Sequence, residues 1–280
     1  MADALAIVTA ASQNHAAPLH NLLFSLDCYE PRTPVIVYDL GLEAEALDVL
    51  RRQRRTVLPF PYEDYPSHIR FETILNCAWK PPLMRDAMQR AGLPLLWLDA
   101  GNLAHAPLAK IRSELATTGF YSPVSAGRVR EWTHPGTLAA LRVEPDLLEL
   151  RNRNGAVIGL GTGEMPRRLL EDWSLAALQP EIIVPPGASK TNHRFDQSVL
   201  TILAIRASRR HGLALADDLF DVSVHNDYRD FTNANLYMRG PAPLRQRKPW
   251  RPPVPAEPPP PQSRLHAFWS KARNLLARTS

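Results

Sequence analysis

The sequence predicts an α/β protein with a mostly parallel central sheet flanked by helices. Short apolar runs recur at 5–9, 33–39, 55–60 and 93–99, and the segments between them have helical spacing of apolar residues. Short apolar strands separated by helices form parallel sheets that helices cover on both faces. Hydrophobic residues make up 45% and charged residues 22% of the 280 residues, which is typical of a globular chain of one large or two small domains.

The individual elements follow from local pattern. Helices are expected at 17–28, at 43–53 and at about 71–89, the last interrupted at Pro81-Pro82. Apolar residues at 199, 202, 203 and 205 predict a further helix that begins near Asp196. The run 219–224 is read as a late strand, and 152–159 as a turn into a strand because Asn154-Gly155 is a typical turn pair.

Proline marks the expected end of the folded body. Ten of the 27 prolines fall between Pro241 and Pro261, which predicts a domain over 1–240, followed by an extended proline-rich linker over 241–262. The segment 263–280 is read as a short basic amphipathic helix. Such a helix suits an anionic membrane surface, but it could equally dock on the body or on a partner, or remain frayed.

Charge is concentrated in the same C-terminal part. The last forty residues carry eight basic side chains and one acid, so the first 240 residues have a net charge of −2 within the total of +5. A nearly neutral body argues against a nucleic-acid-binding domain with a broad basic face.

The compartment is expected to be the cytoplasm. Cys28 and Cys77 are too few for a disulfide framework, and both are expected to be small core residues in a reducing environment. No window approaches the roughly 18 consecutive apolar residues of a membrane span, and the N-terminal segment carries an acid rather than the basic start of a signal peptide. The basic tail would place the protein peripherally at the inner face of the plasma membrane.

Polar or small residues at the predicted strand ends define the candidate site. Ligands of open α/β sheets bind beyond the carboxyl ends of the strands. The residues read at those ends are Thr9, Ala10, Ala11, Asp39, Asp99 and Asn102. No Gly-x-Gly-x-x-Gly follows the first strand and no phosphate-binding Gly-x-x-x-x-Gly-Lys-Ser/Thr loop is present, which disfavours a dinucleotide fold and a P-loop enzyme.

Asp99 is the most informative single residue. It ends the apolar strand Leu96-Trp-Leu-Asp99, where a carboxylate is costly to bury without a partner. It could ligate a divalent cation that bridges phosphates. The alternative is a cap on the turn that follows.

Three further positions are candidates, each with a structural alternative. The run His193-Arg-Phe-Asp196-Gln197 opens a predicted helix, and its polar groups exceed what capping alone requires. Lys80, one of only five lysines, could meet a phosphate or be an ordinary surface lysine. His225 follows the late strand and could ligate a metal or merely fill space. No cysteine–histidine spacing supports zinc, and no Gly-x-Ser-x-Gly elbow indicates a hydrolase.

The order of these motifs resembles nucleotide-sugar-dependent glycosyltransferases of the GT-A fold, in particular the DUF1647-like and family-8-like groups. The resemblance rests on Thr9-Ala, Tyr38-Asp39, Trp79-Lys-Pro81, Trp97-Leu-Asp99, Asn154-Gly-Ala and His193-Arg-Phe-Asp-Gln197, and covers about residues 4–230. It implies a GT-A-like, Rossmann-like sheet and hexosyl transfer from a UDP- or GDP-sugar to a glycan or lipid-linked acceptor, as in polysaccharide biosynthesis.

The resemblance also implies roles for the residues that match its motifs. Thr9, Ala10 and Asp39 would contact base and ribose, Lys80 would lie near the diphosphate, and Arg194, Asp196 and Gln197 would act near the sugar and acceptor. The family's Asp-x-Asp motif, which carries Mn²⁺ or Mg²⁺, would fall at Asp99-Ala-Gly101, with Asn102 as a weak substitute and His225 completing the metal site. Glycine stands in place of the second acid. This departure also fits a protein that keeps the fold and binds a nucleotide or a partner without transfer.

Overall fold

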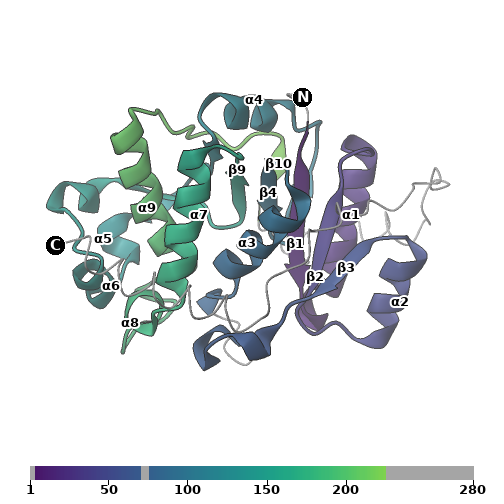
Figure 1. Ribbon diagram of the computed structural model, residues 1–280, viewed down its shortest axis with the longest axis horizontal. Coiled ribbons are helices and arrows are strands. Elements are labelled where there is room, and N and C mark those ends of the chain that lie inside the picture. The colour runs from purple at the N-terminus through teal and green to yellow at the C-terminus, as the bar shows by residue number, and fades with distance from the viewer. Residues whose placement is uncertain (1–3, 71–75, 225–280) are drawn as a thin grey trace.

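A computed structural model describes residues 4–70 and 76–224 and has a six-stranded central sheet within them (Figure 1). The strand order is β3-β2-β1-β4-β9-β6. The bounds are β1 (Ala6–Ala11), β2 (Val35–Asp39), β3 (Thr56–Pro59), β4 (Leu95–Leu98), β6 (Phe120–Tyr121) and β9 (Val157–Leu160). The first four pair in parallel, whereas β9 is antiparallel to both β4 and β6. The predicted fold class, a mostly parallel α/β sheet, is confirmed.

Two short ribbons accompany the sheet among the described residues. β5 (Leu103–Ala104) pairs with β10 (Val222–Ser223), and β7 (Val124–Arg128) pairs with β8 (Arg151–Arg153), both antiparallel. The expected late strand therefore exists, although it is only two residues long. Its pairing with β5 brings the end of the described chain back to the loop that follows β4.

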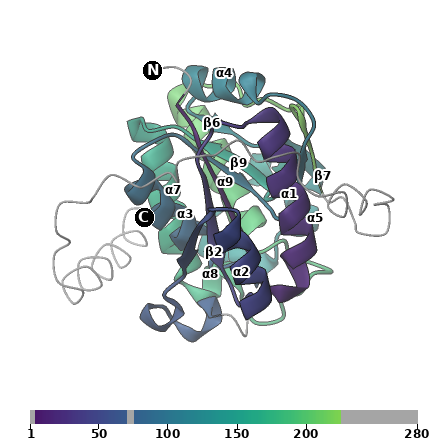
Figure 2. The same ribbon diagram turned by 90° about the vertical axis from the view of Figure 1, so that its right-hand side faces the viewer.

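Helices cover both faces of the sheet (Figures 1 and 2). One layer contains α1 (Ala16–Tyr29), α2 (Ala44–Arg52) and α4 (Ala109–Thr117). The other contains α3 (Lys80–Ala91), α7 (Glu164–Ala177) and α9 (Asp196–His211). Shorter helices are α5 (Val129–Trp132), α6 (Pro135–Ala140) and α8 (Pro180–Ile183), with 3-10 turns at Gln13–His15, Tyr62–Asp64, Ser67–Ile69 and Pro145–Glu149.

The core forms because alternate residues of each strand face opposite helix layers. In β1, Ala6 and Val8 pack with the layer of α3, α7 and α9, whereas Ile7 and Ala11 pack with the layer of α1 and α4. A strand buried on both faces is apolar at nearly every position, which explains why the apolar runs were visible in the sequence.

The expected helix over 71–89 is wrong at its start. Within the described chain the helix begins at Lys80, and Pro81 and Pro82 lie in its first turn instead of interrupting it. Proline is tolerated there because the N–H groups of a first turn have no partner inside the helix. Residues 76–79 are not α-helical, and Cys77 has a left-handed φ of 51°.

Two other expectations are corrected. Thr9 and Ala10 do not follow the first strand, because β1 continues to pair with β2 as far as Ala11 opposite Asp39. The cysteines are not both core residues, since Cys28 is exposed in the last turn of α1 and Cys77 is half-buried.

Arg112 of α4 holds the end of α1 through a buried carboxylate. Its guanidinium donates to Glu30 at 2.8 and 2.5 Å, and Glu30 also accepts from Thr33 Oγ1 and Leu108 N. Burial alone would raise the pKa of Glu30, but these donors lower it below its ordinary value of 4.5. This contribution to stability is therefore present above pH 4.5 and is lost as the pH falls through the lower folded pKa.

Arg112→Ala is expected to lower the free energy of unfolding by about 2–4 kcal/mol at pH 7, because it removes the cation from a buried carboxylate. Denaturant unfolding at pH 7 and pH 4 measures the effect, which should shrink in acid. Arg51→Ala is the matched control, since Arg51 pairs with Asp48 on the exposed face of α2 and should matter by less than about 0.5 kcal/mol. An equal loss of unfolding free energy in the two variants would contradict the stabilising role assigned to the Arg112–Glu30 pair.

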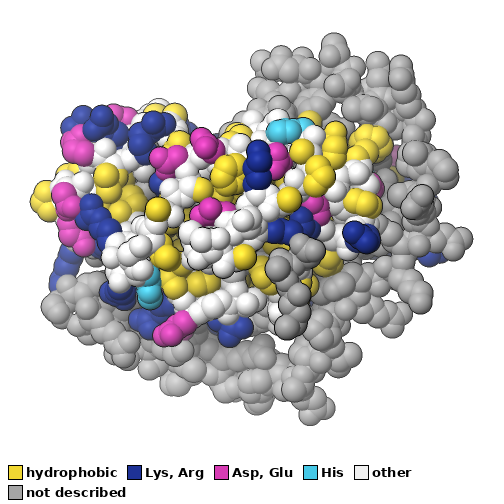
Figure 3. Space-filling model, turned by 90° about the horizontal axis from the view of Figure 1, so that it is seen from above, with side chains coloured by type: hydrophobic (Ala, Val, Ile, Leu, Met, Phe, Trp, Pro, Cys, Tyr) yellow, Lys and Arg dark blue, Asp and Glu magenta, His cyan; other side chains and the backbone are white. Residues whose placement is uncertain are grey.

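Charge on the surface is mixed. On the face shown in Figure 3, basic and acidic side chains are interspersed and do not gather into a field of one sign. Across 4–70 and 76–224, no helix combines the length and the apolar character that crossing a bilayer requires.

Candidate functional site

The candidate site lies at the edge of the sheet where the parallel strands end. Asp39 is the last residue of β2, and Asp99 directly follows β4. Because β9 runs in the opposite direction, the turn that precedes it reaches the same edge, with Val157 paired to Leu98. The Asp99 N–H donates to the carbonyl of Ala156 at 2.9 Å, so the loop after β4 and the turn before β9 are held together.

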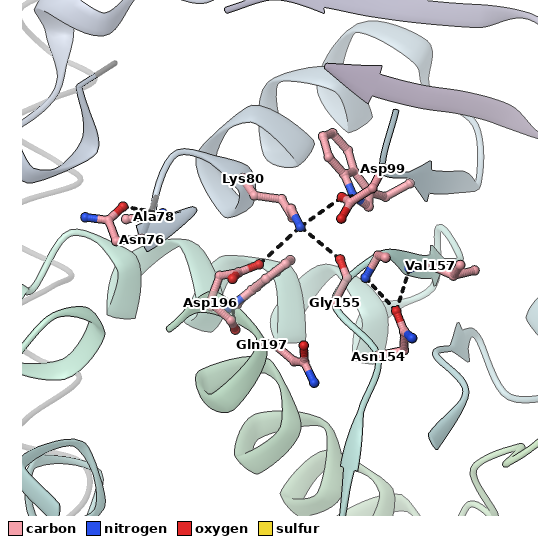
Figure 4. A network of polar contacts seen from close by, with 12 residues as sticks. Asn76, Ala78, Lys80, Asp99, Asn154, Gly155, Val157, Asp196 and Gln197 are labelled. Carbon is pink, nitrogen blue, oxygen red and sulfur yellow. Dashed lines mark hydrogen bonds and ion pairs between the residues drawn. The ribbon is translucent and has the colours of Figure 1, made fainter. Parts of the chain in front are cut away.

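Lys80 is the centre of this edge (Figure 4). Its Nζ forms ion pairs with Asp99 Oδ1 at 3.1 Å and Asp196 Oδ2 at 3.3 Å, and donates to the carbonyl of Gly155 at 2.9 Å. The contact with Asp196 lacks hydrogen-bond geometry. The four groups, which we call the Lys80 cluster, come from the first turn of α3, the end of β4, the turn before β9 and the first turn of α9.

The members of the cluster differ in exposure. The side chains of Lys80 and Asp196 are 4% and 7% exposed, whereas that of Asp99 is 33% exposed. Asp99 is therefore the member that a ligand would meet first. With both carboxylates ionised, one ammonium and two carboxylates leave the cluster with a net charge of −1.

Burial and the oppositely charged partner shift the pKa in opposite directions, both for Lys80 and for Asp196. Burial alone would lower the pKa of Lys80, but the carboxylates of Asp196 and Asp99 more than reverse this, so the pKa is raised and the side chain stays cationic. Burial raises the pKa of Asp196 to about 6; Lys80 opposes this shift and Asp99 adds to it. Perturbed carboxylates of this kind are common at functional sites.

Local backbone strain precedes both helices that deliver the cluster. Phe195, directly before Asp196, has φ 48° and ψ −115°, and Cys77 has φ 51° three residues before Lys80. Non-glycine residues seldom adopt such conformations, which concentrate at functional sites. At α9 the carbonyl of Trp132 accepts from Arg194 N at 3.0 Å and Ser198 Oγ at 2.5 Å, which fixes the strained turn.

Trp97 supports Asp99 from the same strand. Its Nε1 donates to Asp99 Oδ1 at 2.6 Å, and the Lys80 ammonium lies 5.2 Å from the centre of its ring. Cation–π attraction from a buried ring stabilises the ammonium further. This role of Trp97 was not predicted, although residues 97 and 99 share one face of a strand by their spacing of two.

Gln197 lies against the glycine of the cluster. A Cβ added to Gly155 would stand 3.1 Å from Gln197 Cβ, so glycine permits α9 to approach the turn. In that turn Asn154 Oδ1 accepts from Ala156 N at 2.6 Å and Val157 N at 3.2 Å. The chain reverses here before β9 as expected, but neither Asn154 nor Gly155 has a positive φ, so the close approach of Gln197 is the reason for glycine at 155.

The other two polar residues of the helix-start motif, Arg194 and His193, make their contacts outside the Lys80 cluster. Arg194 is exposed, and its guanidinium carbon lies 3.9 Å from the centre of the Trp132 ring. His193 is fully buried, and burial lowers its pKa to about 4. Its ring accepts from His134 N at 3.2 Å and lies 3.4 Å from Thr137 Oγ1, so His193 is a neutral packing residue.

Four predicted donor-binding residues lie outside the cluster. Thr9 and Ala10 are buried inside β1 at 0% and 6% exposure. A ligand could therefore contact them only if the residues that cover this end of the sheet moved. Asp39 Oδ1 accepts from the N–H groups of Gly41 and Leu42, which is the bond pattern of a turn cap. Asn102 is fully buried, donates to the carbonyl of Ala156 at 2.7 Å and has no partner for Oδ1 within the described residues. Their binding roles stay predictions.

The described residues do not fit the divalent cation that the resemblance implies. Asp99 Oδ1 is already engaged by Trp97 and Lys80, and Asp196 faces the same ammonium. Gly101 offers no side chain, and residues 4–70 and 76–224 contain no group of three or more His, Cys, Asp or Glu side chains that could hold a metal. The predicted ligand His225 lies outside the described residues.

Comparison with known proteins gives similar solved structures only. No protein-family model matches the chain, and no curated protein matches it. The crystal structure of the galactosyltransferase LgtC in complex with donor and acceptor sugar analogs is 18% identical, with a TM-score of 0.47 over 70% of this chain and 69% of that chain. An active-site mutant of LgtC is 16% identical, with a TM-score of 0.46 over the same shares, 70% and 69%. The apo structure of the bifunctional glycosyltransferase WbbM is 10% identical, with a TM-score of 0.44 over 71% of this chain and 37% of that chain.

Proposed function

We propose that the protein is a glycosyltransferase that moves a sugar from a UDP- or GDP-sugar to a hydroxyl of a glycan or lipid-linked acceptor. The observation that carries the proposal is the convergence of Lys80, Asp99 and Asp196 at the ligand-binding edge of the sheet. Carboxylates held in fixed positions by a buried ammonium are suited to accept hydrogen bonds from sugar hydroxyls. The motif resemblance from the sequence supports the same reaction class.

Each residue of the cluster has a proposed role that follows from its exposure. Asp99 accepts hydrogen bonds from hydroxyl groups of the bound nucleotide-sugar, because it is the most exposed member of the Lys80 cluster. Asp196 orients the sugar or accepts the proton of the acceptor hydroxyl, for which a pKa of about 6 is appropriate. Lys80 holds both carboxylates in place, since its Nζ is already directed to two carboxylates and a carbonyl.

The leaving diphosphate requires cations other than Lys80. Arg194 is the proposed candidate, because it is exposed two residues before Asp196, the first residue of α9, and its guanidinium would leave the Trp132 ring to meet the diphosphate. Gln197 is proposed to contribute its amide near the transferred sugar. Thr9, Ala10 and Asp39 remain the proposed contacts for base and ribose. Fixed groups of this kind act by positioning the reactants and stabilising developing charge.

A second candidate function is nucleotide or partner binding without transfer. The specific observation in its favour is Gly101, which stands where the second acid of the Asp-x-Asp motif would fall by the motif resemblance. Calorimetry followed by an assay of donor-sugar hydrolysis separates the two candidates, because only a transferase cleaves the donor.

Titration of the full chain with UDP and GDP is expected to show binding that Asp99→Ala weakens by about tenfold to a hundredfold, the range for one hydrogen bond to a charged group. Asp48→Ala, on the exposed face of α2, is the matched control. Binding of neither nucleotide would refute the donor site, whereas binding without donor cleavage would favour the second candidate.

We further propose that the body ends near residue 240 and that 263–280 tethers it to anionic membranes. The support is compositional: the segment pairs Phe268 and Trp269 with basic side chains. The region lies outside the described residues. Deletion of 262–280 should release the protein from vesicles that contain anionic lipid, and unchanged cosedimentation would exclude the tether.

A further inference from the structure

One of the two carboxylate oxygens of Asp99 is already committed. Asp99 Oδ1 accepts from Trp97 Nε1 at 2.6 Å and lies 3.1 Å from the Lys80 ammonium. A divalent ion bound to this Oδ1 at the usual distance of roughly 2–2.6 Å would lie within a few ångströms of that ammonium. At such separations like charges repel by several kcal/mol wherever water is scarce.

The other carboxylate of the cluster is not available either. Asp196 is 7% exposed and faces the same ammonium, so a cation would have to displace Lys80 from its position. Lys80 cannot leave easily, because it is 4% exposed and also donates to the carbonyl of Gly155 at 2.9 Å. One buried ammonium therefore does for the two carboxylates part of what a bound cation would do: it offsets one of their two charges and fixes their positions.

Position 101 has space for an acidic side chain, but glycine stands there and adds no carboxylate beside Asp99. An ideal Cβ at Gly101 would have no atom within 4 Å, and the residue is not in the left-handed region, so a larger side chain would fit. Lack of space therefore does not explain glycine at the position two residues after Asp99.

We propose that Lys80 takes the place of a divalent cation at the two carboxylates and that the diphosphate is met by side-chain cations such as Arg194, so that the protein binds its nucleoside-diphosphate donor equally well with and without Mn²⁺ or Mg²⁺. The nature of the donor rests on the proposed function. The replacement itself rests on the contacts of Lys80, Asp99 and Asp196 and on glycine at 101.

Electron paramagnetic resonance of Mn²⁺ added to the full chain tests the proposal without any nucleotide. The wild-type protein should leave the free Mn²⁺ signal unchanged. Gly101→Asp should remove part of the free Mn²⁺ signal, because it supplies a second carboxylate beside Asp99 Oδ2. Failure of Gly101→Asp to bind Mn²⁺ would overturn the part of the proposal that rests on glycine at 101. Gly163→Asp is the matched control: it adds the same charge in an exposed turn at the other end of β9 and should bind no Mn²⁺.

Calorimetry with UDP and GDP in Mn²⁺ and in EDTA completes the test. Affinities that agree within about threefold support the proposal, and a tenfold gain with Mn²⁺ overturns it. Stoichiometric Mn²⁺ binding by the wild-type chain also overturns it, and loss of that binding in His225→Ala would identify the missing ligand. If neither nucleotide binds in either buffer, the proposed function fails, while the Mn²⁺ signal alone still decides whether a cation site exists.

Discussion

Lys80→Met is expected to lower the free energy of unfolding by about 3–5 kcal/mol at pH 8, the usual cost of leaving buried charge without its partner. The substitution keeps the length of the side chain but removes the ammonium that separates Asp99 from Asp196. Two carboxylates would then face each other at a mostly buried edge, one of them 7% exposed. Donor cleavage should be abolished together with this loss of stability.

The pH dependence of this variant identifies the cause. Without the ammonium, the pKa of Asp196 should rise further above its wild-type value of about 6, because Lys80 is the strongest influence that lowers it. Protonation then relieves the repulsion, so the loss of stability should be smaller at pH 5 than at pH 8. Denaturant unfolding at the two pH values measures the difference.

Two further variants keep the result interpretable. Lys110→Met removes an exposed lysine whose side chain is 68% accessible and whose nearest carboxylate is 3.9 Å away, and it should change stability by less than about 0.5 kcal/mol. The double variant Lys80→Met with Asp196→Asn should recover much of the lost stability, because it leaves a single carboxylate in the cluster. A double variant no more stable than Lys80→Met would show that packing, and not charge, dominates at this position.

Much of the fold could be predicted from the sequence because its strands are buried on both faces. The runs that became β1, β2 and β4 are apolar at almost every position, and the helices α1, α2 and α9 carry clear apolar spacing. The reversed direction of β9 could not be predicted, since an apolar strand has the same pattern in either direction. That reversal brings Gly155 to the same edge as Asp99.

The individual site residues were easier to predict than their pairing. Asp99 was visible as a carboxylate at the end of an apolar strand, and Lys80 as a rare lysine beside two prolines. Their contact depends on where α3 begins, and that start follows a left-handed residue, Cys77, which no propensity would assign to a cysteine. The boundary error at Thr9 has a similar origin, because alanines at 10 and 11 are weak strand formers that pair here only because β2 lies alongside.

Asp196→Asn is expected to stabilise the protein by about 1–3 kcal/mol at pH 8 while it reduces donor cleavage at least about a hundredfold. Burial raises the pKa of Asp196 from its ordinary 3.8 to about 6, so the fold favours the protonated acid. The wild-type protein therefore loses stability as the pH rises from the unfolded pKa of 3.8 to about 6, and the full cost of ionising Asp196 is present above that. Asparagine resembles the protonated acid in shape and carries no charge to bury.

Whether Asp196→Asn stabilises or destabilises the protein distinguishes a functional carboxylate from a structural one. The gain from Asp196→Asn should be largest above pH 6 and should shrink as the pH falls toward 4, and thermal unfolding across that range measures it. Asp48→Asn, in an exposed pair on α2, should show neither the gain nor its pH dependence. If Asp196→Asn were destabilising at every pH, the ion pair with Lys80 would be a structural contact. A stabilised but inactive variant would instead mean that the protein retains a costly buried charge for its chemistry, because residues kept for activity often reduce stability.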